Sequence, residues 1–273
     1  MGLKVDMDIK FGGSLPVAHQ ARPLFNIAAV MTVAGAIRTI EDDTQVPLTE
    51  FLSDRSCIVS FVNAHAINLA CRDRNFLDAL MRANFRLRDG SGVKMLLIAL
   101  GRRSGLNMNG TDLIPRILDA CKATPIALYG SSAAVAAAAA ETLKRQGAIG
   151  VTHCDGFQTR EHYLQRIRAE RPRVVVLGMG MPRQELIADA IVTEASYPIL
   201  IINGGAILDF MAGRVKRAPL RLRQVGLEWL FRLYIEPRRL WRRYLVGNAV
   251  FLTRAGVACL RYRFIGVRDS VKI

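Results

Sequence analysis

The sequence predicts an α/β protein in which helices cover both faces of a parallel sheet and a basic α-helical appendage follows at the carboxyl-terminal end. Three observations support this prediction. Short apolar runs alternate with longer helical runs along most of the chain, as in consecutive βαβ units. The run VVVLG has the composition of a strand buried on both faces, which is typical of a parallel sheet. The last sixty residues concentrate positive charge and aromatic side chains. The predicted core is therefore Rossmann-like.

The elements of this core are expected between residues 25 and 212, after an irregular leader at 1–24 that contains a glycine pair and two prolines. Short apolar runs that end in small or polar residues predict five strands, at 57–62, 85–88, 126–129, 173–177 and 199–203. Longer runs with apolar residues at helical spacing predict six helices, at 66–83, 93–100, 112–122, 133–146, 160–170 and 184–193.

Small or polar residues follow the end of every expected strand. They are Asn63, Asp89-Gly90, Gly130-Ser131, Gly178 and Gly204-Gly205. In folds of this kind, ligands bind at the carboxyl ends of the strands, so we expect the functional residues at these turns.

The sequence GMGMPRQE, which begins at Gly178, resembles the start of a dinucleotide-binding turn, because glycines let backbone N–H groups approach a diphosphate. The third glycine of GxGxxG is absent, and Pro182 stands where the helix would begin, so an NAD-type oxidoreductase is a minor alternative. The Gln184 carboxamide could hydrogen-bond to a uracil or a sugar hydroxyl. Glu185 could accept hydrogen bonds from free N–H groups of the turn. The alternative to a binding role is that these side chains only cap the turn.

Asp89 stands at a strand end before Gly90 and Gly92 in RLRDGSGV. An aspartate there can take a proton from an acceptor hydroxyl as a general base, although Asp-Gly is also a common turn dipeptide. The chain has no HExxH, no GxSxG, no Cys/His cluster and no GxxxxGK followed by Ser or Thr. We therefore expect neither a metal nor a cofactor.

The appendage, residues 213–273, is the most basic part of the chain. From residue 214 it holds 15 Lys and Arg against three acidic residues, a net +12 of the chain's +15. Trp229 and Trp241 and several leucines alternate with the arginines, which is how a helix contacts an anionic membrane surface. Nucleic acid would attract the same charge, and a core helix with a solvated basic edge would show the same pattern.

The expected location is the cytoplasm. The first ten residues mix acids and bases and lack the basic-then-apolar order of a secretory signal. No apolar run approaches the roughly 20 residues of a membrane-spanning helix, and the longest candidate, 244–260, contains Arg254. The five cysteines form no CxxC pair and are expected to be reduced and mostly buried.

Taken together, the turns and the appendage resemble the WecG/TagA/CpsF family, glycosyltransferase family 26, from about residue 25 to 251. The matching pieces are Asn63 in FVNAHAINLA, Asp89-Gly90-x-Gly92-Val93, Gly110-Thr111-Asp112-Leu113, Asp155-Gly156-Phe157, Gly178-x-Gly180-x-Pro182-x-Gln184-Glu185, Gly204-Gly205, Asp209-Phe210, Gly213, Arg217-Ala218-Pro219, Gly226-Leu227-Glu228-Trp229, Arg232-Leu233, Glu236-Pro237-x-Arg239 and Arg243-Tyr244.

The resemblance implies a metal-independent, inverting transfer of a sugar from a UDP-sugar to an undecaprenyl-diphosphate-linked acceptor, in cell-surface or exopolysaccharide biosynthesis. It implies a protein bound peripherally to the inner face of the cell membrane, without a nucleic-acid partner, and it allows a homo-oligomer. Asp89 would be the base. Asn63, Gln184 and Glu185, with the glycines 178, 180, 204 and 205, would line the donor pocket.

In the same picture, Arg232, Arg239 and Arg242 of the appendage would contact a diphosphate. Their spacing predicts that they share one helical face, which Pro237 can bend. Two positions depart from the family pattern. Phe61 replaces a frequent threonine, and Asn107 replaces a usual arginine, so the identity of the sugar stays open.

Overall fold

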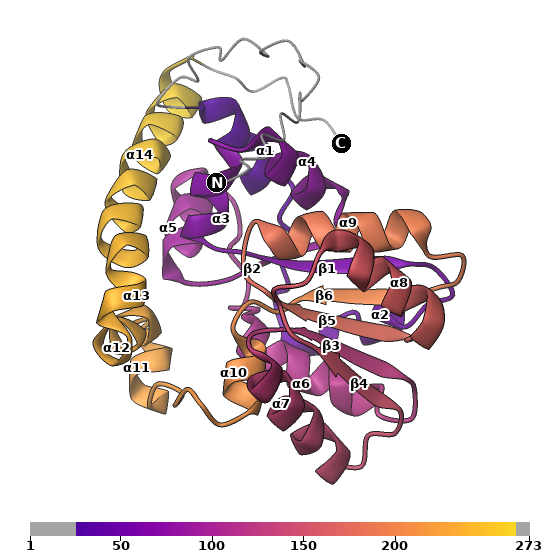
Figure 1. Ribbon diagram of the computed structural model, residues 1–273. Helices are drawn as coiled ribbons and strands as arrows, with labels where there is room; N and C mark the ends of the chain where they lie inside the picture. Colours follow the sequence, from indigo (N-terminus) through magenta and orange to yellow (C-terminus); the bar gives the residue numbers. More distant parts are fainter. Residues whose placement is uncertain (1–25, 266–273) are drawn as a thin grey trace, which may run out of the picture.

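The structure, a computed structural model, describes residues 26–265, and the leader expected at 1–24 lies outside the described residues. Six parallel strands form one sheet in the order β2-β1-β6-β5-β3-β4, and helices pack on both of its faces (Figure 1). The predicted fold class is therefore confirmed. The strands are β1 Cys57–Val62, β2 Phe85–Arg88, β3 Ile126–Gly130, β4 Val151–Cys154, β5 Val174–Gly178 and β6 Leu200–Asn203.

All five predicted strands are present, with ends within one residue of the prediction, but β4 was not predicted. It pairs only with β3 at an edge of the sheet, and Thr152 and His153 in its middle are only half-buried. Because four residues with two polar side chains give no clear apolar run, the signal for this strand is weak.

The helices of the first half are α1 Ile27–Gly35, α2 Leu48–Phe51, α3 Ala64–Ala70, α4 Arg74–Arg82, α5 Ser91–Ala99, α6 Gly110–Ala120 and α7 Ala133–Arg145. Those of the second half are α8 Arg160–Glu170, α9 Arg183–Glu194, α10 Ile207–Met211, α11 Leu220–Gln224, α12 Glu228–Ile235, α13 Pro237–Trp241 and α14 Gly247–Ile265. A 3-10 turn at Asp43–Gln45 precedes α2, and a π-helical segment at Arg242–Val246 joins α13 to α14.

The single helix predicted at 66–83 is wrong, because the structure divides it into α3 and α4. The division lies at Asp73, whose backbone is extended and whose side chain accepts a 3.1 Å hydrogen bond from the N–H of Phe76. Aspartate is a favoured N-cap residue, and here it starts a second helix inside one apolar pattern.

The strand residues alternate between two apolar layers. Val174 and Val176 of β5 face the layer formed with α6, α7 and α10, whereas Val175 and Leu177 face the layer formed with α8 and α9. A third buried cluster joins α1, α3, α4, α5 and α14 beside the β1–β2 end of the sheet. The parallel sheet is thus covered on both faces, as its continuous apolar strands require.

Helix α14 is part of this third cluster and runs along one side of the molecule beside α3 and α5 (Figure 1). Phe251 and Ala258 are 2% and 0% exposed. The Arg254 guanidinium donates to the Oδ1 of Asn68 at 2.9 Å, and the Nδ2 of Asn68 donates to the carbonyl of Gly247 at 2.7 Å. The boundary predicted after residue 212 stays a prediction, but α14 within the appendage is packed as core.

We expect Phe251→Ala to lower the free energy of unfolding by about 3–5 kcal/mol, because truncating a buried phenylalanine leaves a cavity. The matched control is Phe264→Ala on the same helix, where the side chain is 78% exposed and the change should stay within about 0.5 kcal/mol. Urea unfolding of both variants measures the difference. Similar small losses in both would show that α14 does not share the core in solution.

Candidate active site

The predicted site residues of the core gather at one edge of the sheet, because all six strands are parallel and end there. Asn63 follows β1, Asp89 follows β2, Gly178 ends β5, and Gly204 and Gly205 follow β6. Strand pairing brings Val62 opposite Arg88, so that Asn63 and Asp89 are direct neighbours across two strands.

A crevice is expected where neighbouring strands send their connections in opposite directions, and β3 and β5 do so. The chain leaves β3 toward β4 and leaves β5 toward β6. Gly130 and Gly178 pair there so closely that a Cβ on Gly130 would collide with the Gly178 backbone. Ser131 follows with a positive φ of 53°, and its hydroxyl donates to the Oδ1 of Asp209 at 3.3 Å. Strained backbone of this kind is frequent at binding sites.

The Gln184 side chain is used inside the protein. It is 1% exposed, and its Oε1 accepts from the N–H groups of Gly180 at 3.1 Å and Gly205 at 3.0 Å. Its Nε2 donates to the Oε1 of Glu185 at 2.9 Å. Gln184 therefore connects the turn after β5 to the turn after β6. It satisfies backbone N–H groups of these turns, which is the capping expected of Glu185.

The glycine turns offer space rather than free donors. The N–H groups of Gly180 and Gly205 bind Gln184, and that of Gly204 donates to the carbonyl of Leu177 at 2.9 Å. Gly180 and Gly205 have positive φ values of 81° and 59°, and a Cβ on either would meet nothing within 4 Å. A ligand can therefore approach the backbone at both turns.

Asp89 is held by the residues at the ends of β1 and β2. Its N–H donates to the carbonyl of Val62 at 2.9 Å, and its Oδ2 accepts from the Nδ2 of Asn63 at 3.3 Å. The Oδ1 of Asn63 accepts from the N–H of Ala66 at 3.1 Å and thereby caps α3. Because both ends of the Asn63 amide are used, its NH₂ group is directed at the Asp89 carboxylate.

Arginines from the core and from the appendage lie close enough to act on Asp89. Desolvation by the surrounding protein raises the pKa of Asp89, while Asn63, Arg243, Arg232 and Arg88 oppose that rise. The residue as a whole is half-buried. A carboxylate with a raised pKa is a better proton acceptor than an exposed aspartate.

The appendage is attached to the core beside this carboxylate. Asp112, in the first turn of α6, pairs with Arg217 at 2.5 Å and with Arg223 at 3.6 Å, and the Nδ2 of Asn109 donates to its other oxygen at 2.7 Å. Arg217 also lies 3.9 Å from Glu228 at the start of α12. These ion pairs orient α11 and α12 over the carboxyl ends of the strands.

Several guanidinium groups of the appendage have donors without a hydrogen-bond partner among residues 26–265. They are Nε of Arg223, Arg232 and Arg243, and Nε and Nη2 of Arg217. Buried donors without a partner cost free energy, and an anion would satisfy them. The arrangement is therefore suited to a negatively charged ligand.

Two of the three arginines predicted to contact a diphosphate are exposed on the surface of the appendage. Arg239 is exposed and pairs with Glu236 at 2.6 Å, and the exposed Arg242 lies over the ring of Trp241, 5.2 Å from its centroid. The single helical face expected for them is wrong, because α12 ends at Ile235, Pro237 begins α13, and a π-helical segment follows. The predicted site did not include Arg243, which is half-buried and close enough to Asp89 to oppose the rise of its pKa.

Within residues 26–265, no group of three His, Cys, Asp or Glu side chains is placed to hold a metal ion. His65 lies near Arg243, and burial together with the charges of Arg243 and Arg72 lowers its pKa to about 4. His65 is therefore neutral near pH 7. In the same part of the chain, no helix is both long and apolar enough to cross a membrane.

Glu185 is 2% exposed, its Oε2 has no partner within the described residues, and burial raises its pKa to about 7. Between its ordinary pKa of 4.5 and about 7, the unfolded chain releases this proton and the folded chain keeps it. The free energy of unfolding should therefore fall as pH rises through this window, by about 3 kcal/mol at most.

Glu185→Gln should remove this loss, so that its unfolding free energy changes less than that of the parent between about pH 5 and pH 8. Urea unfolding at the two pH values measures the difference, with Glu141→Gln at an exposed position of α7 as the control. The same pH dependence in Glu185→Gln and the parent would show that Glu185 is ionised throughout.

Comparison with known proteins agrees with the resemblance in the motifs. Residues 29–265 match the glycosyl transferase WecG/TagA/CpsF family. An N-acetylglucosaminyldiphosphoundecaprenol N-acetyl-beta-D-mannosaminyltransferase of Bacillus subtilis is 30% identical over 194 residues, which cover 69% of this chain and 75% of that protein. A protein of the same name from Bacillus spizizenii is 31% identical over 182 residues, covering 64% and 70%. The chain belongs to the WecG/TagA/CpsF family of glycosyl transferases.

Proposed function

We propose that this protein is an inverting glycosyltransferase that moves a hexosyl or N-acetylhexosaminyl group from a UDP-sugar to a polyprenyl-diphosphate-linked acceptor. One observation carries the proposal: Asp89, at the end of β2 and with a raised pKa, lies where core and appendage arginines converge. The two relatives are named for N-acetylmannosaminyl transfer to an N-acetylglucosaminyl-diphosphoundecaprenol, and such an acceptor carries both a hydroxyl and a diphosphate. Family membership favours transfer over nucleic-acid binding and over NAD chemistry.

In the proposed reaction, the Asp89 carboxylate takes the proton of an acceptor sugar hydroxyl. The hydroxyl oxygen forms a bond to the anomeric carbon of the donor while the bond from that carbon to UDP breaks. The electron pair of the broken bond passes to the UDP diphosphate, and the attack from the opposite side inverts the configuration. Asn63 is a positioning residue in this step, since its amide orients the Asp89 carboxylate.

The donor nucleotide is proposed to lie in the crevice between β3 and β5, over the turns that Gln184 ties together. Open space beside Gly180 and Gly205 leaves room for it, whereas Leu208 and Ile207 pack against Gly178 and Gly204. Arg232 and Arg243 are proposed to hold the diphosphate of the acceptor next to Asp89, with Arg239 and Arg242 further out. Arginines can compensate the acceptor's charge without a metal ion, and the family resemblance implies a metal-independent transfer, so activity should persist in EDTA.

Asp89→Asn should lower kcat by about 10²–10⁴-fold, because the amide cannot accept the hydroxyl proton. Transfer from a panel of UDP-sugars to a short-chain N-acetylglucosaminyl diphosphate lipid measures this, with Asp119→Asn at an exposed position as control. In the parent, kcat/KM should fall as pH drops through a pKa above the usual 3.8, because only the ionised carboxylate is a base. Near-parental turnover in Asp89→Asn would remove Asp89 as the base.

Adjacent arginines test the proposed diphosphate contact. Arg243→Ala should lower kcat/KM for the acceptor by about tenfold or more, as expected for losing a hydrogen bond to a charged group. Arg242→Ala should have a smaller effect, because Arg242 is exposed and lies over Trp241. Titration of acceptor at saturating donor measures both. A larger loss in Arg242→Ala would assign the diphosphate to the arginine that the sequence predicts.

We also propose peripheral binding to an anionic membrane through α11–α14, where exposed arginines alternate with exposed apolar side chains such as Trp241 and Leu245. Deleting the appendage is a poor test, since it would remove Phe251 from the core. Arg221→Ser with Arg238→Ser should weaken binding to anionic vesicles, by about 1 kcal/mol for each arginine at low salt. Lys144→Ser with Arg145→Ser, exposed on α7, is the control, and equal binding of both double variants would contradict the proposal.

A further inference from the structure

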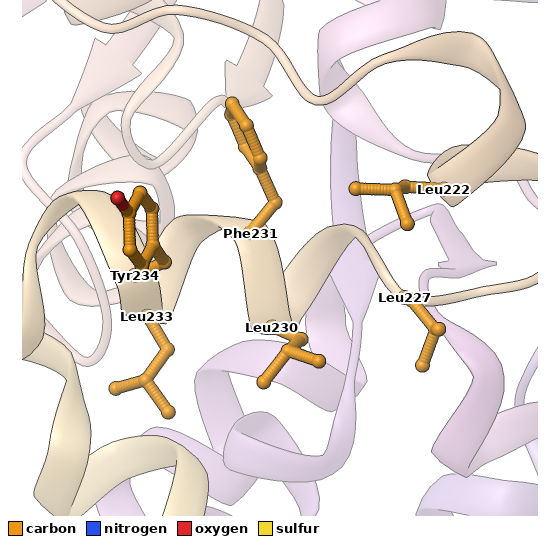
Figure 2. A pocket seen from close by; sticks show the side chains of 6 residues that line it. All are labelled: Leu222, Leu227, Leu230, Phe231, Leu233 and Tyr234. Carbon is orange, nitrogen blue, oxygen red and sulfur yellow. The ribbon is translucent and has the colours of Figure 1, made fainter.

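An apolar groove lies between α11 and α12. Its volume is about 440 Å³, within the range of about 300–1,000 Å³ that is usual for small-molecule sites. Leu222 extends from α11 toward Phe231 of α12 (Figure 2). Tyr234 is 84% and Leu230 47% exposed, so the groove is open to solvent. The lining residues, all apolar or aromatic, are Leu222, Leu227, Leu230, Phe231, Leu233 and Tyr234.

The groove begins next to the turn that carries Asp89. Gly226, directly before Leu227, has a φ of 76°, and its carbonyl accepts from the hydroxyl of Ser91 at 3.4 Å. Ser91 is two residues after Asp89 and begins α5. A Cβ on Gly226 would lie only 3.2 Å from the Cβ of Ser91, so the two turns are in close contact.

Helix α12 therefore contributes side chains both to the surroundings of Asp89 and to the groove. Arg232 is close enough to Asp89 to oppose the rise of its pKa, whereas its neighbours Phe231 and Leu233 line the groove. A ligand that fits both environments has an anionic group beside a hydrocarbon chain. A lipid diphosphate has this division of charge and apolar surface within one molecule.

We propose that this groove holds the first isoprene units of the acceptor's polyprenyl chain while Arg232 and Arg243 hold its diphosphate. The inference rests on the proposed function for the acceptor class. It goes further because it assigns the polyprenyl chain a binding site on the protein, so that the protein recognises the lipid as well as the diphosphate. The groove then aligns the acceptor, because a chain fixed beside Gly226 directs its headgroup toward Asp89.

The test compares two soluble acceptors with the same N-acetylglucosaminyl diphosphate headgroup, one with a single isoprene unit and one with a farnesyl chain, without vesicles and below micelle formation. The parent should prefer the farnesyl acceptor by about tenfold or more in kcat/KM, because the groove buries the additional hydrocarbon. Leu230→Gln and Tyr234→Gln should bring this ratio close to one. Tyr234 is so exposed that its replacement should leave the fold intact.

Ile149→Gln is the control, because Ile149 is 61% exposed at the opposite, amino-terminal edge of the sheet and should keep the parental ratio and activity. An unchanged ratio in both groove variants would overturn the proposal. If the same variants bound vesicles more weakly, the groove would contact the bilayer, and if they lost a parental dimer in light scattering, it would contact a second copy.

Direct titration with isopentenyl and farnesyl diphosphate separates this inference from the proposed function. Tighter binding of farnesyl diphosphate, lost in Leu230→Gln and Tyr234→Gln, supports the groove even if the parent transfers sugar to neither acceptor. In that case the proposed function fails while the lipid site stands. Equal binding of the two diphosphates by the parent overturns the lipid site whatever the transfer assay shows.

Discussion

The site depends on the contact between one carboxylate of the core and the arginines that the appendage brings to it. Asp89 is surrounded by protein, which disfavours its charge, and Arg88, Arg232 and Arg243 oppose this effect. Burial lowers the pKa of Arg243, and repulsion by Arg232 and Arg239 lowers it further. Positive charge exceeds what Asp89 can balance, and several guanidinium donors lack a partner among the described residues. An anionic ligand would relieve both conditions.

This contact requires the appendage to be held in place from both ends. Asp112 binds Arg217 and Arg223 near its start, and Asn68 binds α14 further along through Gly247 and Arg254. Between these attachments, α12 and α13 lie over the carboxyl ends of the strands and expose most of their side chains. These two attachments contribute to folding, and the segment between them can contact a ligand, so only surface substitutions in that segment test function without disturbing the core.

The sequence predicts the fold well, because apolar runs such as VVVLG and the residues that end them are local signals. Asp89 and Asn63 could be placed for the same reason, since parallel strands end at one edge. Which arginines lie near Asp89 could not be predicted, because their positions depend on a helix that stops before Pro237 and on the π-helical segment that follows α13. The internal use of Gln184 was equally invisible, since it joins two turns that are distant in the chain.

The two sides of the site differ in how they can recognise a substrate. On the sheet side, glycines leave space and Gln184 keeps the turns rigid, so that shape decides what fits. On the appendage side, formal charges and an apolar groove act together, so that a ligand must combine an anion with hydrocarbon to satisfy both. A free nucleotide lacks the hydrocarbon, and a neutral lipid lacks the charge. In the proposed reaction, this physical division of the site would direct donor and acceptor to different sides before any specific contact with either sugar is made.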